Sequence, residues 1–191
     1  MTDQRVFGIV GWKNSGKTTL VERLVTELTG RGITVSTVKH AHHRVDVDQE
    51  GTDSWRHRAA GAREVMLASG RRWALMHELR EEPEPSLEAL LAQMTPVDLV
   101  LVEGFKRGGH DKVEVHRAES GGALLAHEDT TVRAVATDIA VGGTAVGANA
   151  VGGTAVADPA FSHLGEGIPV LALDDVAGIA DFILASTGLA R

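Results

Sequence analysis

Eight residues near the amino end combine the groups that are needed to hold a polyphosphate. They read Gly11-Trp12-Lys13-Asn14-Ser15-Gly16-Lys17-Thr18 and match the pattern Gly-x4-Gly-Lys-[Ser/Thr] without a mismatch. Backbone N–H groups of such a loop turn inward onto the phosphate oxygens, and the glycines at 11 and 16 permit close approach. We expect Lys17 to reach the β- and γ-phosphates and the Thr18 hydroxyl to bind Mg²⁺. The segment predicts a nucleoside triphosphate site with its metal ion.

The elements on either side of this segment are those that a phosphate-binding loop (P-loop) requires. Val6–Val10 is a short apolar run with β-branched residues, typical of a buried strand. Apolar residues recur three and four positions apart over Thr18–Thr29, which predicts an amphipathic helix that Gly30 ends. Ile33–Val38 predicts a second strand. The opening is therefore a βαβ unit, with the loop at the positive end of the helix dipole.

A second half of the site is expected at the end of a neighbouring buried strand, where an acid holds the metal directly or through water. The apolar run Val97–Val102 contains Asp98 at its beginning and is followed by Glu103. Ligands of parallel sheets bind at the carboxyl ends of the strands. Glu103 is on that edge and Asp98 is not, so we predict Glu103 as the metal-side acid. The alternative is an acid in an ordinary surface turn.

The polar loop after the second strand begins at the same edge of the predicted sheet. Lys39 or His40 could meet phosphate there, and Asp46 or Asp48 could reach Mg²⁺ through water. Two other interpretations stay open. His40, His42 and Asp46 could form a transition-metal site, or the whole loop could be solvated and without a ligand.

The rest of the chain continues the alternation of strands and helices. Further strands are predicted at 64–68 and 72–76 (as a hairpin), 112–116, 132–137 and 170–173. Helices are predicted towards 61 with Asp53 or Ser54 as the cap, to 94 with Ser86 as the cap, and from 174 to about 186. This order is typical of an α/β protein with a mainly parallel sheet covered by helices on both faces.

Composition favours one soluble domain over residues 1–191. The chain has 43% hydrophobic and 24% charged residues, no cysteine and a net charge of −7. The absence of cysteine excludes disulfides and thiolate metal sites, and the negative charge makes nucleic acid a poor partner. No signal peptide or bilayer-spanning apolar run is visible, which predicts a cytoplasmic protein that does not enter the membrane.

One segment departs from this pattern. Ala140–Val146 recurs identically as Ala150–Val156, rich in glycine and without charge. Such a run buries little surface against its ordering entropy, so we expect a loosely ordered insertion at about 140–157.

The sequence resembles the MobB-type molybdopterin-guanine dinucleotide biosynthesis adaptor proteins. The matching segments cover residues 6 to about 117: they are 11–20, Val-Lys-His-Ala-His-His at 38–43, Asp-Val-Asp at 46–48, 51–54, 60–62, Arg-Trp-Ala-Leu-Met at 72–76 and Leu-Val-Glu-Gly-Phe-Lys at 101–106. The last third matches loosely, at 136–138 and 169–175.

The resemblance implies a three-layer P-loop NTPase domain and a homodimer. Such proteins bind GTP, hydrolyse it weakly at most, and assist the MobA-type guanylyltransferase that joins GMP to molybdopterin. The residues that would contact GTP are Gly11, Trp12, Lys13, Asn14, Ser15, Gly16, Lys17, Thr18 and Thr19. Thr18, Glu103 and Asp46 would surround Mg²⁺, with Lys39 and His40 near the phosphates.

The preference for guanine rests on the resemblance, because the Asn-Lys-x-Asp motif of many GTPases is missing. Asp138 follows a predicted strand and could lie near a base. A small-molecule kinase is the alternative function, favoured only by the basic pairs Arg71-Arg72 and Lys106-Arg107. An ATP-driven partition or metallochaperone-like switch is disfavoured, because Trp12 separates Lys13 from the first glycine and cysteines are missing.

Overall fold

The computed structural model describes residues 4–41, 46–120, 122–139, 161, 164 and 167–190. The chain divides into two compact units, one made of Met1–His40 with Thr95–Arg191 and the other of Ala41–Met94. The repeat insertion predicted at about 140–157 lies outside the described residues, as do His42 and His43.

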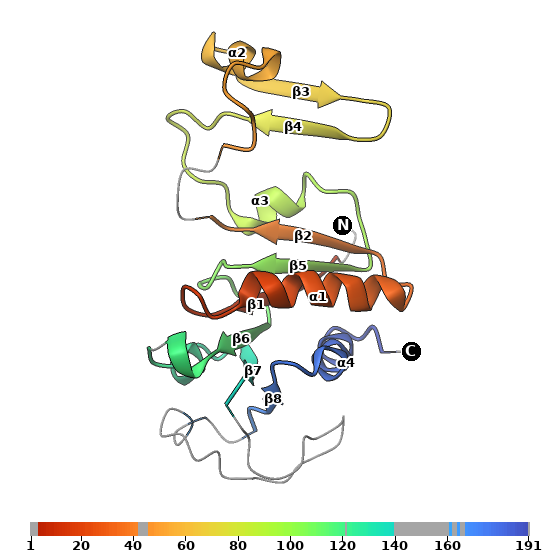
Figure 1. The fold of residues 1–191 in the computed structure, drawn as a ribbon, viewed down its shortest axis with the longest axis vertical. Helices are drawn as coiled ribbons and strands as arrows, with labels where there is room; N and C mark the ends of the chain where they lie inside the picture. The colour runs from red at the N-terminus through yellow and green to blue at the C-terminus, as the bar shows by residue number, and fades with distance from the viewer. Residues whose placement is uncertain are drawn as a thin grey trace. The chain divides into compact units, whose positions relative to one another are not determined.

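The first unit is built on a six-stranded sheet in the order β2-β5-β1-β6-β7-β8 (Figure 1). All five strand pairings are parallel, which confirms the predicted sheet. The strands are β1 Arg5–Val10, β2 Val35–Lys39, β5 Leu99–Glu103, β6 Lys112–His116, β7 Val132–Thr137 and β8 Val170–Ala172. The helices of this unit are α1 Lys17–Gly30 and α4 Val176–Ser186, with short 3₁₀ turns η1 Ala118–Ser120 and η2 Leu125–His127.

Alternation along β1 divides the core between the two faces of the sheet. Phe7 and Ile9 pack with α1 and α4 in one cluster, whereas Val10 packs in a second cluster with residues from η2 and β7. The helical period predicted for α1 is confirmed by its buried residues, which are Leu20, Val21, Leu24 and Leu28. Burying each such aliphatic side chain is worth about 1.5–3 kcal/mol. This packing fixes where α1 begins, and with it the loop that precedes α1.

Parallel pairing brings the carboxyl ends of the strands to one edge. Lys39 at the end of β2 pairs in register with Glu103 at the end of β5, which in turn pairs with Ile9 of β1. Asp98 is at the opposite edge, where its Oδ2 accepts from the backbone N–H and the hydroxyl of Thr34 at 2.8 and 2.6 Å. Asp98 therefore connects the start of β5 to the start of β2.

The second unit contains the predicted hairpin and two short helices. They are α2 Asp53–Ala59, the antiparallel strands β3 Glu64–Ala68 and β4 Trp73–His77, and α3 Leu87–Leu91. The N-cap of α2 is Thr52, whose side chain accepts from Trp55 N; the predicted cap at Asp53 or Ser54 is wrong. Ser54 lies inside the first turn of α2, where its hydroxyl donates to Asp48 at 2.9 Å. Ser86 caps α3 as predicted, but the helix ends at Leu91, before residue 94.

Within the part of the chain that the structure describes, no helix has the length and apolar character to cross a bilayer.

Candidate phosphate-binding site

The loop between β1 and α1 has the backbone that its glycines were expected to allow. Gly11, Asn14 and Gly16 have φ values of 144°, 65° and 94°. A Cβ on Gly11 would lie 2.4 Å from the carbonyl oxygen of Val115 in β6, closer than any side chain tolerates. Residue 11 therefore has to be glycine, because the loop is packed directly against the backbone of the neighbouring strand.

Lys17 lies in the first turn of α1 and folds back onto the loop. Its Nζ donates to the carbonyl oxygen of Trp12 at 2.6 Å. Burial lowers the pKa of Lys17 below its ordinary value, and the nearby charges of Lys106 and Lys39 act in the same direction against Glu103. An anion at the loop would reverse this effect, because it would favour the charged ammonium.

Thr18, Glu103 and Lys39 converge on one point beside the loop. The Thr18 hydroxyl donates to Glu103 Oε1 at 2.7 Å, and Lys39 Nζ lies 3.2 Å from Thr18 Oγ1 and 3.1 Å from Glu103 Oε1. Glu103 is 9% exposed. Mg²⁺ prefers oxygen ligands such as a hydroxyl and a carboxylate. In this structure the same two oxygen atoms already contact the ammonium group of Lys39. The arrangement therefore fits a magnesium ion held by Thr18 and Glu103.

His40 connects the end of β2 to the segment after β5. Its backbone N–H donates to Glu103 O at 2.9 Å, and its ring stacks on Phe105 with centroids 4.6 Å apart. Its predicted proximity to phosphate stays a prediction.

Asp46 belongs to the second unit and is engaged there by Arg58. Both carboxylate oxygens accept from Arg58 Nη2, at 2.8 and 2.9 Å, and this interaction lowers the pKa of Asp46. Arg58 also pairs with Asp48 at 3.3 Å and Glu78 at 2.7 Å. These contacts organise the second unit, so a role of Asp46 at Mg²⁺ stays a prediction. Over the described ranges no group of three His, Asp or Glu side chains is arranged to hold a metal.

Trp12 and Lys106 form a contact that pattern reasoning did not assign. Lys106 Nζ lies over the Trp12 ring, 4.1 Å from its centroid. The indole N–H donates to Ala123 O at 2.8 Å, so Trp12 packs against its own unit. The available signal was the basic pair at 106–107, which lies three residues after the metal-side acid.

Arg117 is a second residue that no motif in the sequence indicates, and it connects the loop to Asp138. Its Nε donates to Ser15 O at 3.2 Å and its Nη1 lies 3.3 Å from Asp138 Oδ2. The backbone N–H of Ala118 donates to the other carboxylate oxygen at 3.3 Å. Asp138 is thus attached, through one side chain, to the phosphate loop. Its place directly after a predicted strand was the only signal in the sequence.

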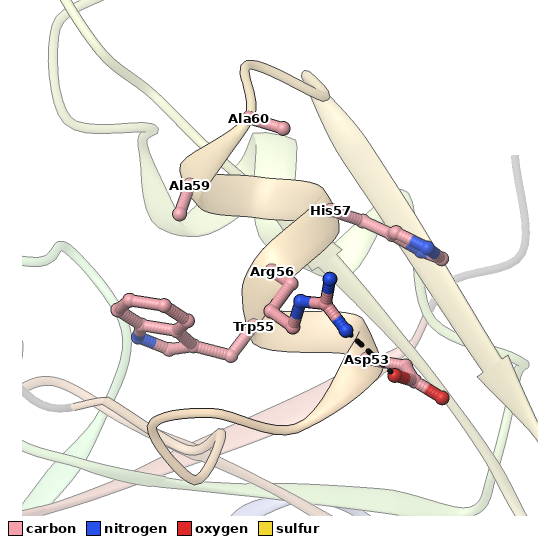
Figure 2. Close-up of a pocket in the computed structure, with 6 residues that line it drawn as sticks. All are labelled: Asp53, Trp55, Arg56, His57, Ala59 and Ala60. Carbon is pink, nitrogen blue, oxygen red and sulfur yellow. Dashed lines mark ion pairs between the residues drawn. The ribbon is translucent and has the colours of Figure 1, made fainter.

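A pocket of about 440 Å³ lies elsewhere, on the surface of α2 (Figure 2). Its lining residues are Asp53, Trp55, Arg56, His57, Ala59 and Ala60. Their side chains point in different directions from α2 and its last turn, and the only ion pair among these six residues is the exposed Asp53–Arg56 contact at 3.8 Å. Convergent polar groups are what marks a binding site, so we assign this pocket no function.

A glycine-bounded loop thus lies between a buried strand and a helix, and its Thr18 hydroxyl is bonded to the buried Glu103. The family described as molybdopterin guanine dinucleotide synthesis protein B (MobB) has a sequence model that matches residues 6–138. The chain belongs to the MobB family. The matched range contains every predicted nucleotide-binding and metal-binding residue.

Relatives in the MobB family extend the similarity beyond the loop. A molybdopterin-guanine dinucleotide biosynthesis adapter protein of Haemophilus influenzae is 48% identical over 136 residues, covering 70% of this chain and 74% of that protein. One of Escherichia coli is 35% identical over 184 residues, covering 94% and 91%. The crystal structure of a molybdopterin-guanine biosynthesis protein B has a TM-score of 0.65 at 28% identity, covering 95% of this chain and 99% of that one. A MobB homologue from Bacillus stearothermophilus has a TM-score of 0.64 at 26% identity, covering 97% and 99%. The predicted family and the P-loop α/β fold are confirmed.

Proposed function

We propose that this chain is a GTP-binding adapter protein of molybdenum cofactor biosynthesis. In this role it assists a MobA-type guanylyltransferase in attaching GMP to molybdopterin. The observation that carries the proposal is that Lys17, Thr18 and Glu103 lie together at the loop. The relatives of this chain are named as adapter proteins of this pathway. The relatives' names support the pathway, and the site's chemistry supports a nucleoside triphosphate with Mg²⁺.

Weak hydrolysis is part of the proposal. Among the described residues, the hydrogen bonds of Lys17, Thr18 and Glu103 involve no arginine or glutamine side chain. Arg117 does contact the loop, but it donates to Ser15 O and pairs with Asp138. Arginine fingers and water-orienting glutamines raise hydrolysis rates by orders of magnitude. The protein therefore binds and presents GTP, with slow turnover.

The choice of guanine is supported by the position of Asp138. A carboxylate can accept from both N1–H and the 2-amino group of guanine, whereas adenine has no donor at position 1. Asp138 follows β7, two strands away from β1 in the sheet, and is connected to Ser15 through Arg117. Asp138 is therefore at the same edge of the sheet as the loop, and each of its carboxylate oxygens, which already accepts one hydrogen bond, has a second lone pair that could accept from guanine.

A homodimer is the proposed assembly, and the hairpin supports it. In the described residues β3 and β4 pair only with each other. Met66, Trp73 and Leu75 are on one face of this two-stranded sheet and are 61%, 65% and 43% exposed. An isolated hairpin is marginally stable, and its apolar face gains by being covered. We propose that a second copy of this chain covers it.

The test is calorimetric titration of the purified protein with GTP and ATP in Mg²⁺, beside the Lys17→Ala variant. We expect binding of GTP by the wild type and none by the variant, with circular dichroism unchanged, because Nζ bonds only a loop carbonyl in the free protein. Equal affinities of the two proteins for GTP would refute the site. Formation of guanine dinucleotide cofactor by the guanylyltransferase, with and without this chain, tests the adapter role.

A further inference from the structure

The segment that follows the metal-side acid has an unusual backbone. Gly104 and Phe105 both have positive φ, 97° and 49°. The left-handed region is unfavourable for a non-glycine residue, so Phe105 needs stabilisation from its surroundings. Two ring contacts supply it on either side: His40 stacks on Phe105, and Lys106 lies over Trp12. The Gly104 N–H donates to Ile9 O at 3.1 Å and so continues the pairing of β5 with β1, and the ring contacts hold the residues that follow it.

Trp12 is the point where two lysines meet. Lys106 Nζ lies over one face of its ring, and its carbonyl oxygen accepts a hydrogen bond from Lys17 Nζ. Lys17 and Lys106 thus contact the same loop residue, Lys17 Nζ at 2.6 Å from its carbonyl oxygen and Lys106 Nζ at 4.1 Å from its ring centroid. Two ammonium groups that repel each other beside an anion-binding loop form an electrostatic complement to a polyphosphate.

The contact that Lys106 makes in the free protein is a weak one. A cation over an aromatic ring that is exposed to solvent gains little, because water screens the attraction. A hydrogen bond between an ammonium and a phosphate oxygen is charge-assisted and roughly twice as strong as a neutral one. Lysine has a flexible four-carbon stem, so its ammonium can leave the ring while its backbone stays in place.

We infer that Lys106 is a phosphate-binding residue that moves from the Trp12 ring to the terminal phosphate when a nucleoside triphosphate enters the loop. The inference rests on the proposed function, because it takes this loop to be the triphosphate site. The position on the chain indicates which phosphate. Lys106 follows Glu103 by three residues, and Glu103 with Thr18 would hold the metal ion that neutralises the charge of the terminal phosphates. Lys106 thus distinguishes a triphosphate from a diphosphate.

The first test compares affinities for a non-hydrolysable GTP analogue and for GDP. Lys106→Met keeps an apolar stem and removes the charge. We expect its affinity for the triphosphate analogue to fall about tenfold, because one charge-assisted hydrogen bond is lost, and its affinity for GDP to stay within twofold. Arg107→Met is the matched control, since it removes the adjacent positive charge, and Lys106→Arg should retain the discrimination.

The second test follows the contact itself and leaves Lys106 in place. The chain has three tryptophans, and Trp55 and Trp73 belong to the second unit. A Trp55→Phe/Trp73→Phe protein therefore reports from Trp12 alone. We expect its emission to change with the triphosphate analogue and much less with GDP. Adding Lys106→Met should remove the difference between the two nucleotides.

The inference is overturned if Lys106→Met weakens both nucleotides equally, if Arg107→Met has the same effect, or if Trp12 emission responds alike to both nucleotides. A wild-type protein that binds neither nucleotide would instead refute the proposed function. The two failures are therefore distinguishable.

Discussion

Thr18 and Glu103 are 85 positions apart in the chain, and the hydroxyl of one donates to the carboxylate of the other at 2.7 Å. Thr18 belongs to the first turn of α1 and Glu103 to the end of β5. Lys39, at the end of β2, lies within 3.2 Å of the same hydroxyl oxygen. Three elements thus bring a hydroxyl, an acid and a cation to one point, and the predicted metal chemistry depends on this meeting.

Removing the Thr18 hydroxyl should weaken GTP binding only when Mg²⁺ is present. Thr18→Ala deletes one oxygen ligand of the proposed metal, and we expect affinity in Mg²⁺ to fall about tenfold or more, the scale of one lost hydrogen bond to a charged group. With EDTA the variant and the wild type should bind GTP alike. Thr18→Ser keeps the hydroxyl and should bind normally in calorimetry. A Thr18→Ala protein with full magnesium-dependent affinity would contradict the assignment.

Asp138→Asn should convert the base preference from guanine to xanthine. The amide has one acceptor in place of two, so it cannot satisfy both N–H groups of guanine, but its NH₂ can donate to the 2-oxo group of xanthine. We expect GTP affinity to fall by about 10- to 100-fold, from one unsatisfied polar contact, and XTP affinity to rise.

Competition titrations with GTP, XTP and ATP would measure this change of preference. Asp111→Asn is the matched control, because that acid pairs with Arg133 on the surface, at 2.8 Å. An Asp138→Asn variant that binds GTP like the wild type and ignores XTP would exclude Asp138 as the guanine acceptor.

Polar substitutions on the hairpin should dissociate the proposed dimer. Trp73→Ser and Leu75→Ser each remove an exposed apolar side chain from one strand without touching a buried core position. We expect sedimentation velocity to show a dimer for the wild type and a shift towards monomer for these variants, with Arg71→Ser at the turn as control. A wild type that is monomeric over the measured concentration range would overturn the proposed assembly.

Protonated His77 should stabilise the second unit. His77 Nδ1 lies 2.7 Å from Glu64 Oε1, and this hydrogen bond raises the pKa of His77 above its ordinary value of 6.5. A raised folded-state pKa means that the stabilisation is complete below about pH 6.5 and is lost as the pH rises through the folded value. Histidine NMR titration should show this pKa above 6.5 in the wild type and closer to 6.5 in Glu64→Gln. An unchanged value in Glu64→Gln would rule out Glu64 as the cause.

The elements and the phosphate loop were predictable because their signals are local. The loop pattern, the β-branched run before it and the three-and-four spacing after it lie within about 25 residues, and backbone geometry dictates each of them. Glu103 was predictable for a related reason. A carboxylate directly after a buried strand of a parallel sheet has to emerge at the carboxyl edge, wherever the sheet places that strand.

Only the tertiary structure decided which side chains from distant segments meet at that edge. Strand order brings Arg117 to Ser15 and Asp138, and loop packing brings Lys106 to Trp12. Neither pairing has a fixed spacing in the chain, because each depends on the register of strands far apart in sequence and on the path of the intervening loops. For the same reason the sequence determined that this chain has an anion-binding loop, whereas the fold decided which further cations and acids surround it.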